Sequence, residues 1–187
     1  SEAPIKGHFP SKYKIYDGKI PFEQRIDSVM HWFRLPESIR PQLVMLYFSE
    51  PDYTGHVYGV NNSIMNDKIK EMDDLLGYIV KSLKKNEIFS KINIIVTSDH
   101  GMVNVSKERL IILDEYISLL DELNIYGNGS HMQFDFKNNN VLIEKTVLQE
   151  LKSIPNINYW RKDDIPKRFY FNNRNTGSIL VLADEGW

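Results

Sequence analysis

The sequence predicts an α/β fold in which a mainly parallel sheet is flanked by helices. Two short apolar runs, residues 43–48 and 92–97, are typical of strands that are buried on both faces. Between them, residues 62–83 carry apolar side chains at helical spacing. A strand, a helix and a second strand over this length make a βαβ unit, whose strands are parallel and whose crossover is almost always right-handed.

Composition places the chain among soluble globular proteins. Its 187 residues, 42% of them hydrophobic and 26% charged, suffice for one domain or a large part of one. The 23 Lys and Arg residues nearly balance the 25 Asp and Glu residues, so we expect no basic patch for nucleic acid. No apolar run approaches the roughly 18 residues of a membrane helix, so we also expect no membrane segment in this chain.

Cysteine is absent from the sequence. This excludes a thiolate nucleophile, a cysteine-bound zinc and a disulfide in these 187 residues. Any metal ligands must therefore be Asp, Glu or His side chains.

The N-terminal half begins with an extended segment. Proline and glycine recur through residues 1–21, which predicts no long helix there. A helix packed by one face should follow, because Pro21 suits a first helical turn and Pro36 lies beyond the end. Its apolar residues at helical spacing are Phe22, Ile26, Val29, Met30 and Phe33. For the helix between the two apolar runs, Asn62 or Ser63 is the expected N-cap.

The second half has weaker signals. Glycine at 127 and 129 marks a loop, and no linker rich in glycine, serine or proline separates two domains. We expect a helix near residues 144–152 and short strands at 109–113, 132–136, 157–161, 168–171 and 178–182.

A polar cluster follows each of the two apolar runs. Asp52 and His56 come after the first run, and Asp99 and His100 come directly after the second. Because ligands bind at the carboxyl ends of strands in open α/β sheets, we expect the two clusters to meet at one edge. Oxygen and nitrogen ligands suit zinc, with manganese or iron as alternatives. Either cluster alone could be a turn aspartate beside a surface histidine, but the two together favour a metal site.

Two stretches of the sequence resemble a known family. Residues 49–59 and 93–102 resemble two signature blocks of the nucleotide pyrophosphatase/phosphodiesterases, within the alkaline phosphatase superfamily. The blocks read Ser-Glu-Pro-Asp-Tyr-Thr-Gly-His-Val-Tyr-Gly and Asn-Ile-Ile-Val-Thr-Ser-Asp-His-Gly-Met. The likeness extends over nearly the whole chain, densely to about residue 117, and includes residues 21–26, 66–74 and 183–187.

The resemblance implies an alkaline-phosphatase-like α/β fold, of which residues 1–187 would be the central portion of a single catalytic domain without its N- and C-terminal parts. It implies two zinc ions, with Asp99 and His100 holding one and Asp52 and His56 the other. Two ions about 4 Å apart can stabilise the attacking and leaving oxygens of an in-line phosphoryl transfer. Tyr47 would stack on the base of a nucleotide, although a tyrosine buried in the core is an equal alternative.

The chain departs from the family pattern at its catalytic nucleophile. The family uses a threonine that forms a phospho-threonine intermediate, and this threonine and one metal-ligating aspartate lie before the part that the chain resembles. A further metal-ligating histidine lies after it. No threonine of this chain, at positions 54, 97, 146 or 176, sits in the nucleophile motif. We therefore expect no catalytic nucleophile here, and we expect companion segments of the same parent chain to supply it.

The expected function is hydrolysis of phosphodiester or pyrophosphate bonds by the parent protein, with a nucleotide or a related small molecule as substrate. Within the superfamily, the alternatives are a phosphomonoesterase, a sulfatase or a phosphonate hydrolase. The Glu-Pro-Asp-x-x-Gly-His form favours the diesterase branch. A third alternative is that the isolated chain is catalytically incomplete. Family resemblance alone implies an extracytoplasmic location, which would be periplasmic, secreted or at the cell surface.

Overall fold

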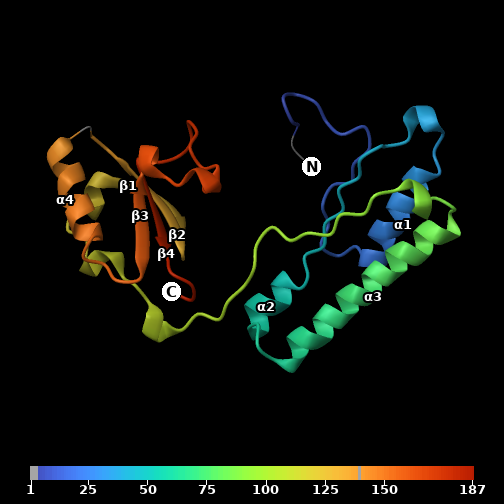
Figure 1. Cartoon of the computed structure of the whole chain (residues 1–187), viewed down its shortest axis with the longest axis horizontal. Helices are drawn as coiled ribbons and strands as arrows, with labels where there is room; N and C mark the ends of the chain where they lie inside the picture. Colours follow the sequence, from blue (N-terminus) through green and yellow to red (C-terminus); the bar gives the residue numbers. More distant parts are fainter. Residues whose placement is uncertain (1–3, 139) are drawn as a thin grey trace. The chain divides into compact units, whose positions relative to one another are not determined.

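A computed structural model of the chain describes residues 4–138 and 140–187 (Figure 1). It divides into two compact units, one that ends at Met102 and one that begins at Val103. The prediction that residues 1–187 belong to one catalytic domain stays a prediction. Of the predicted N-terminal extended segment, residues 1–3 lie outside the described part, and residues 4–21 contain no helix.

The first unit is built on two helices that pack side by side, α1 (Phe22–Phe33) and α3 (Ser63–Lys85) (Figure 1). Their predicted starts are confirmed. Helix α1 begins directly after Pro21, and the Asn62 side chain caps α3 by accepting a hydrogen bond from the Met65 N–H at 2.9 Å. The core that the two helices share consists of Ile26, Val29, Met30, Leu75 and Leu83.

A short helix that the sequence analysis missed, α2 (Asp52–Tyr58), lies between the first apolar run and α3. Gly59, with φ of +79°, follows its last residue. This backbone conformation is one that glycine adopts without steric cost. The polar cluster that begins at Asp52 is therefore helical and not a loop.

The two predicted strands, 43–48 and 92–97, have an extended backbone but form no ladder with any described residue. The side chains of 43–48 alternate as strand side chains would, whereas in 92–97 Ile94, Ile95 and Val96 are all exposed. Val44, Leu46 and Phe48 pack against the α1–α3 core, as does Ile92. On the opposite face Leu43, Met45 and Ile95 are 80%, 91% and 87% exposed. Packing on the helices thus holds residues 43–48 and the start of 92–97 in place, whereas a ladder also needs a hydrogen-bonding neighbour.

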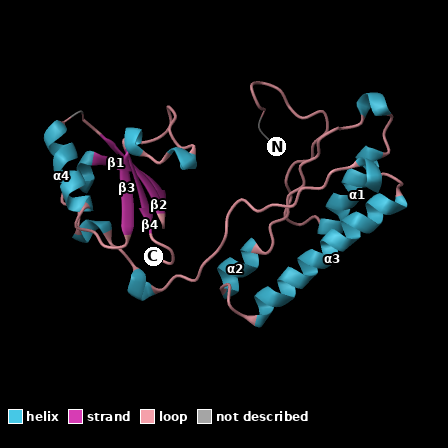
Figure 2. Ribbon diagram, in the orientation of Figure 1, coloured by secondary structure: helices cyan, strands magenta, loops and turns pink. Residues whose placement is uncertain are grey.

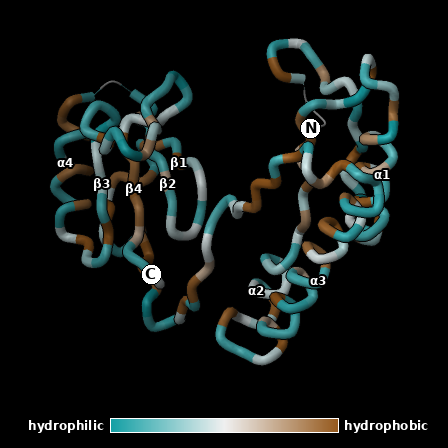
Figure 3. Tube along the Cα trace, turned by 45° about the vertical axis from the view of Figure 1, so that its right-hand side comes forward, coloured by the Kyte–Doolittle hydropathy of each residue, from teal (hydrophilic) through white to brown (hydrophobic). Residues whose placement is uncertain are grey.

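The second unit is a four-stranded antiparallel sheet with one long helix (Figure 2). The strands are β1 (Leu123–Asn128), β2 (His131–Phe136), β3 (Ile157–Arg161) and β4 (Ile179–Ala183), in the order β1-β2-β4-β3. Helix α4 (Val141–Leu151) covers one face with Val147 and Leu151, which pack on Phe134, Ile179 and Val181. Strand β4, one of the two central strands, is hydrophobic along its whole length (Figure 3).

The loop before β4 packs on the other face of this sheet. The Gly177 N–H donates to Gln133 Oε1 at 2.8 Å, and the Ser178 N–H and hydroxyl both donate to Asp135 Oδ1. Because these polar side chains of β2 are satisfied by the loop, the face can be covered without leaving them unpaired.

Predictions for the second half hold in part. Helix 144–152 and strands 132–136, 157–161 and 178–182 are confirmed within a few residues by α4, β2, β3 and β4. The strands predicted at 109–113 and 168–171 are wrong. Short 3-10 turns replace them, because Ser106 caps one turn through the Glu108 N–H and the other follows Pro166 and ends at Tyr170 with φ of +50°.

Short 3-10 helices connect the larger elements of both units. Their bounds are Glu37–Ile39, Phe89–Lys91, Lys107–Arg109, Leu113–Glu115, Leu120–Glu122, Lys162–Asp164 and Lys167–Phe169.

The predicted α/β class is confirmed by these helices and strands, but the sheet of the described residues is antiparallel and not mainly parallel. Among the helices so described, none is long and apolar enough to cross a membrane.

Candidate metal centre

Helix α2 presents one predicted ligand pair. Asp52 is its first residue and His56 lies one turn later, so both side chains project from the same face of the helix. His56 Nε2 lies 3.5 Å from Asp52 Oδ1. The i, i+4 spacing was visible in the sequence, and it was the signal that could have predicted this helix.

The second predicted pair is brought to the first, as the sequence analysis expected. His100 Nε2 lies 3.7 Å from Asp52 Oδ1 and 3.8 Å from Asp99 Oδ1. Asp52 thus lies near the imidazoles of His56 and His100, and Asp99 joins them through its approach to His100. The convergence arises without the predicted parallel ladder.

A close contact between α2 and Met102, two residues after the second pair, accounts for this convergence. Gly55 is buried in α2, and a β-carbon built on it would lie 2.5 Å from Met102 Sδ and 3.0 Å from Met65 Cε. Only a residue without a side chain leaves room for this approach. Gly55 thus lets the segment that carries Asp99 and His100 lie against α2.

The N-terminus of α2 is capped from outside the helix. Pro51, at the N-cap position, makes no side-chain capping bond. Instead, the Thr54 N–H donates to Glu50 Oε2 at 3.0 Å, while the Tyr53 and Gly55 N–H groups donate to the carbonyls of Ser49 and Pro51. Thr54 is only 3% exposed, so water could not replace Glu50 as the hydrogen-bond acceptor of its N–H.

Asp52 Oδ1 has the environment of a metal ligand. Among the described residues it is buried without a hydrogen-bond partner, although imidazole nitrogens lie 3.5 and 3.7 Å away. An unpaired buried carboxylate oxygen is costly unless a cation compensates it. Carboxylate oxygens and imidazole nitrogens are ligands that zinc accepts, so the types of residue present here fit zinc.

The ligand set is small in number. Within residues 4–138 and 140–187, no three or more His, Cys, Asp or Glu side chains are grouped so as to hold a metal ion. Each predicted pair supplies two side chains, whereas catalytic zinc sites usually have three protein ligands. Each predicted pair is therefore one protein ligand short of the usual number.

The protonation of His100 is set by its neighbours. Its Nδ1 donates to the Gly101 carbonyl at 2.9 Å. This bond, together with the negative charges of Asp99 and Asp52, raises the pKa of His100. The same bond leaves Nε2 as the nitrogen that faces the carboxylates, which is the orientation that a metal-ligating imidazole needs.

Tyr47, the predicted substrate-binding residue, is 58% exposed, so it is not the buried core tyrosine of the alternative interpretation. Its ring makes an edge contact with Tyr16 at a centroid distance of 6.1 Å. The Arg25 guanidinium donates to the Tyr47 carbonyl at 3.2 Å and lies over the Tyr16 ring. Sequence reasoning missed both neighbours, which come from segments distant in sequence. A contact with substrate stays a prediction.

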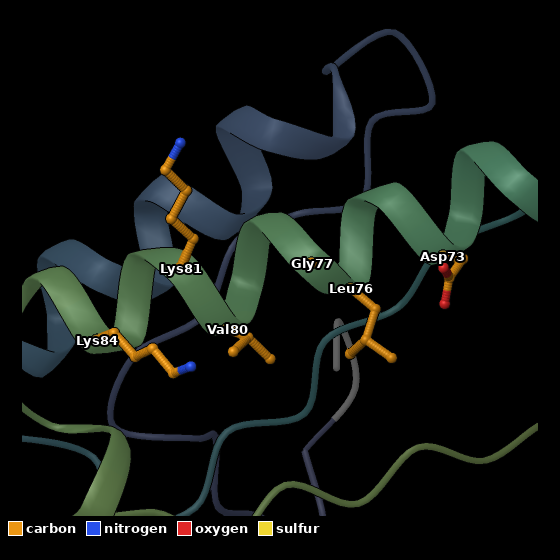
Figure 4. A pocket seen from close by; sticks show the side chains of 6 residues that line it. All are labelled: Asp73, Leu76, Gly77, Val80, Lys81 and Lys84. Atoms are coloured by element: carbon orange, nitrogen blue, oxygen red, sulfur yellow. The ribbon is translucent and has the colours of Figure 1, made fainter.

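Two cavities on the surface of the described residues lie away from these side chains. One of about 530 Å³ runs along α3 and is lined by that helix alone, with Leu76 and Val80 pointing to the same side and Lys81 pointing away (Figure 4). Another of about 340 Å³ is lined by Lys14, Asp27, Ser28, His31 and Trp32. Neither contains a predicted ligand, so the candidate site rests on its side chains and not on a cavity.

Fold and side chains together describe an α/β protein with two Asp–His pairs close to each other, and comparison with known proteins identifies its family. The profile of the type I phosphodiesterase / nucleotide pyrophosphatase family matches residues 1–187. The chain belongs to this family, which confirms the resemblance seen in its two signature blocks.

Named relatives agree with this assignment. The chain is 33% identical over 193 residues to human ectonucleotide pyrophosphatase/phosphodiesterase family member 5, and it covers 38% of that protein. It is 33% identical to human bis(5'-adenosyl)-triphosphatase ENPP4, covering 41%, and 30% identical to the venom phosphodiesterase of Macrovipera lebetinus, covering 23%. The chain thus spans less than half the length of these relatives.

Solved structures carry the same fold. Murine ectonucleotide pyrophosphatase/phosphodiesterase 5 matches with a TM-score of 0.86 and 33% identity, over all of this chain and 49% of that one. An inactive threonine-to-alanine variant of the murine protein, solved in complex with AMP, matches with the same TM-score. The match confirms the predicted fold class, and the chain spans about half of the structure it matches.

Proposed function

We propose that the protein containing this chain hydrolyses phosphodiester or pyrophosphate bonds in nucleotides or related small molecules. The observation that carries the proposal is the approach of the two predicted ligand pairs, with His100 Nε2 3.7 Å from Asp52 Oδ1. Family membership supports the type of reaction, and relatives named as nucleotide pyrophosphatases, phosphodiesterases and a bis(5'-adenosyl)-triphosphatase support the class of substrate.

Asp99 and His100 would hold one zinc ion, and Asp52 and His56 the other. Zinc bound there would supply positive charge that stabilises the transferring phosphoryl group and its attacking and leaving oxygens. The protein's own contribution is orientation. Helix α2 fixes Asp52 and His56 relative to each other, and the Gly101 carbonyl fixes the ring of His100.

The nucleophile is proposed to be a threonine outside these 187 residues. The inactive threonine-to-alanine variant of the murine relative supports a threonine in that role. The same relative binds AMP, which supports a nucleotide as ligand, and Tyr47 is the exposed aromatic residue that we propose for its base. We further propose an extracytoplasmic location, because the relatives include proteins of a secreted venom.

Hydrolysis of three p-nitrophenyl compounds by the whole protein with added zinc tests this function. We expect turnover of a p-nitrophenyl nucleotide ester to exceed that of p-nitrophenyl phosphate and p-nitrophenyl sulfate by at least tenfold. Preference for the phosphate or the sulfate would support the phosphomonoesterase or sulfatase alternatives and contradict the proposal. Zinc content should be measured on the same sample, with about two ions per protein expected.

A further inference from the structure

We infer that Glu50 is a positioning residue for the metal centre, holding the helix that carries Asp52 and His56 through a hydrogen bond to the Thr54 backbone. The inference rests on the proposed function, because it assumes that these two side chains bind zinc. It adds a residue whose side chain points to the backbone of α2 and not to the ions.

The geometry at the start of α2 makes Glu50 necessary. A helix leaves its first N–H groups without partners inside the helix, and an N-cap side chain usually accepts one of them. Pro51 occupies that position and has no side-chain acceptor. Glu50 reaches past it, and its Oε2 accepts the N–H of Thr54 at 3.0 Å, where Thr54 is 3% exposed.

The charge of Glu50 acts in the same place. A carboxylate near a helix N-terminus is stabilised by the partial positive charge of the unpaired N–H groups. Glu50 also faces Lys68 of α3, which forms an ion pair with Glu71 at 2.6 Å. The hydrogen bond to Glu71 raises the pKa of Lys68, and the negative charges of Glu71 and Glu50 act in the same direction.

The other end of α2 is held as well. Asn62 Nδ2 donates to the carbonyls of Tyr58 and Gly59, at 2.9 and 2.8 Å. A helix of seven residues has too few internal hydrogen bonds to be stable alone, so these external bonds fix its position. Glu50 is the external partner at the end where Asp52 lies, and Asp52 is the carboxylate that lies near both His56 and His100.

Zinc affinity of the whole protein tests the inference, with three variants compared. Glu50→Ala removes the acceptor for the Thr54 N–H and should weaken zinc binding about tenfold, the lower end of the effect of losing a direct partner of a metal ligand, because Glu50 acts through the helix backbone. Glu50→Gln keeps an acceptor oxygen of the same reach and should stay within about threefold of the wild type. Glu71→Gln, the matched control, removes a neighbouring carboxylate on Lys68 without touching α2 and should leave zinc affinity unchanged.

Amide hydrogen exchange of the peptide that contains Thr54 gives a readout independent of activity. Exchange should speed up in Glu50→Ala and stay slow in Glu50→Gln and Glu71→Gln. Wild-type zinc affinity and wild-type exchange in Glu50→Ala would overturn the inference, and so would equal losses of zinc affinity in all three variants. If Glu50→Ala does not fold, Glu50→Asp, one methylene shorter, takes its place with the same expected results.

Asp52→Ala separates this inference from the proposed function. If Asp52→Ala lowers zinc binding and Glu50→Ala does not, the metal site stands and the positioning role of Glu50 is wrong. If the wild type binds no zinc, or Asp52→Ala binds as much as the wild type, the metal assignment itself has failed.

Discussion

Two glycines in neighbouring helices should respond differently to the same substitution. Gly77 of α3 is exposed, and a β-carbon built on it would meet no atom within 4 Å. Gly55 of α2 is buried, and the same β-carbon would lie 2.5 Å from Met102 Sδ and 2.8 Å from its Cε. Gly77→Ala therefore adds a methyl group in open space, whereas Gly55→Ala adds one where Met102 already lies.

The expected magnitudes follow from two opposing effects. Replacing glycine by alanine inside a helix stabilises it by about 1 kcal/mol at both positions. At Gly55 an overpacking cost of about 1–3 kcal/mol opposes this gain. The atoms in the way belong to the flexible end of Met102, so we expect a cost near the lower end. Gly77→Ala should raise the free energy of unfolding by about 1 kcal/mol, and Gly55→Ala should leave it unchanged or lower it.

Chemical denaturation of the wild type and the two variants measures the difference directly. Zinc affinity should be measured beside it, because displacing the Met102 side chain alters the contact between α2 and the segment that carries Asp99 and His100. Equal stabilisation by the two substitutions, with unchanged zinc affinity in Gly55→Ala, would refute the contact that we hold responsible for bringing the ligand pairs together.

Three further predictions follow from single side chains. Asp52→Ala should remove bound zinc and nearly abolish hydrolysis, whereas His131→Ala, at an exposed strand end in the other unit, should retain both. Metal analysis and turnover of the nucleotide ester test this difference. An active, zinc-loaded Asp52→Ala would contradict the assignment. Phe134→Ala, fully buried against α4, should lower the free energy of unfolding by about 3–5 kcal/mol, and a loss below 1 kcal/mol in denaturant titration would be inconsistent with that packing. The hydrogen bond from the Tyr78 hydroxyl to Asp27, 2.8 Å long, raises the pKa of Tyr78, so its stabilisation is present below the ordinary tyrosine value of about 10 and is lost as pH rises through the raised pKa. Tyr78→Phe should lower the free energy of unfolding by less than about 1 kcal/mol at pH 8, because the pair is solvent-exposed, and should not lower it once the wild-type hydroxyl has ionised. Denaturant titrations at several pH values measure this loss, and a loss that grows with pH would contradict the prediction.

The sequence predicts best the elements whose signals are local. Helices α1 and α3 have clear breakers or caps at their starts and a continuous apolar stripe, and their starts are where they were expected. Strand β1 was missed, because the glycines at 127 and 129 favour a loop. Its pairing with β2, from Leu123 opposite Phe136 to Asn128 opposite His131, overrides that preference. Such pairing is a tertiary effect that one segment cannot reveal.

The sequence predicted which residues form the candidate site, but not which elements bring them together. Asp52, His56, Asp99 and His100 were expected to meet, and they do. The expected reason was a pair of parallel strands, whereas the observed reason is a helix packed against Met102 through Gly55. The capping role of Glu50 depends on the direction of its side chain, which a motif does not contain.

The alternation along residues 43–48 also bears on how this piece of the protein could be handled in solution. Leu43, Met45 and Ile95 present a bare apolar face on extended backbone, which is the kind of surface through which chains stick to one another. Val44, Leu46 and Phe48 face the helices and hold the unit together. Lysine or threonine at 45 and 95 should therefore improve solubility at little cost in stability.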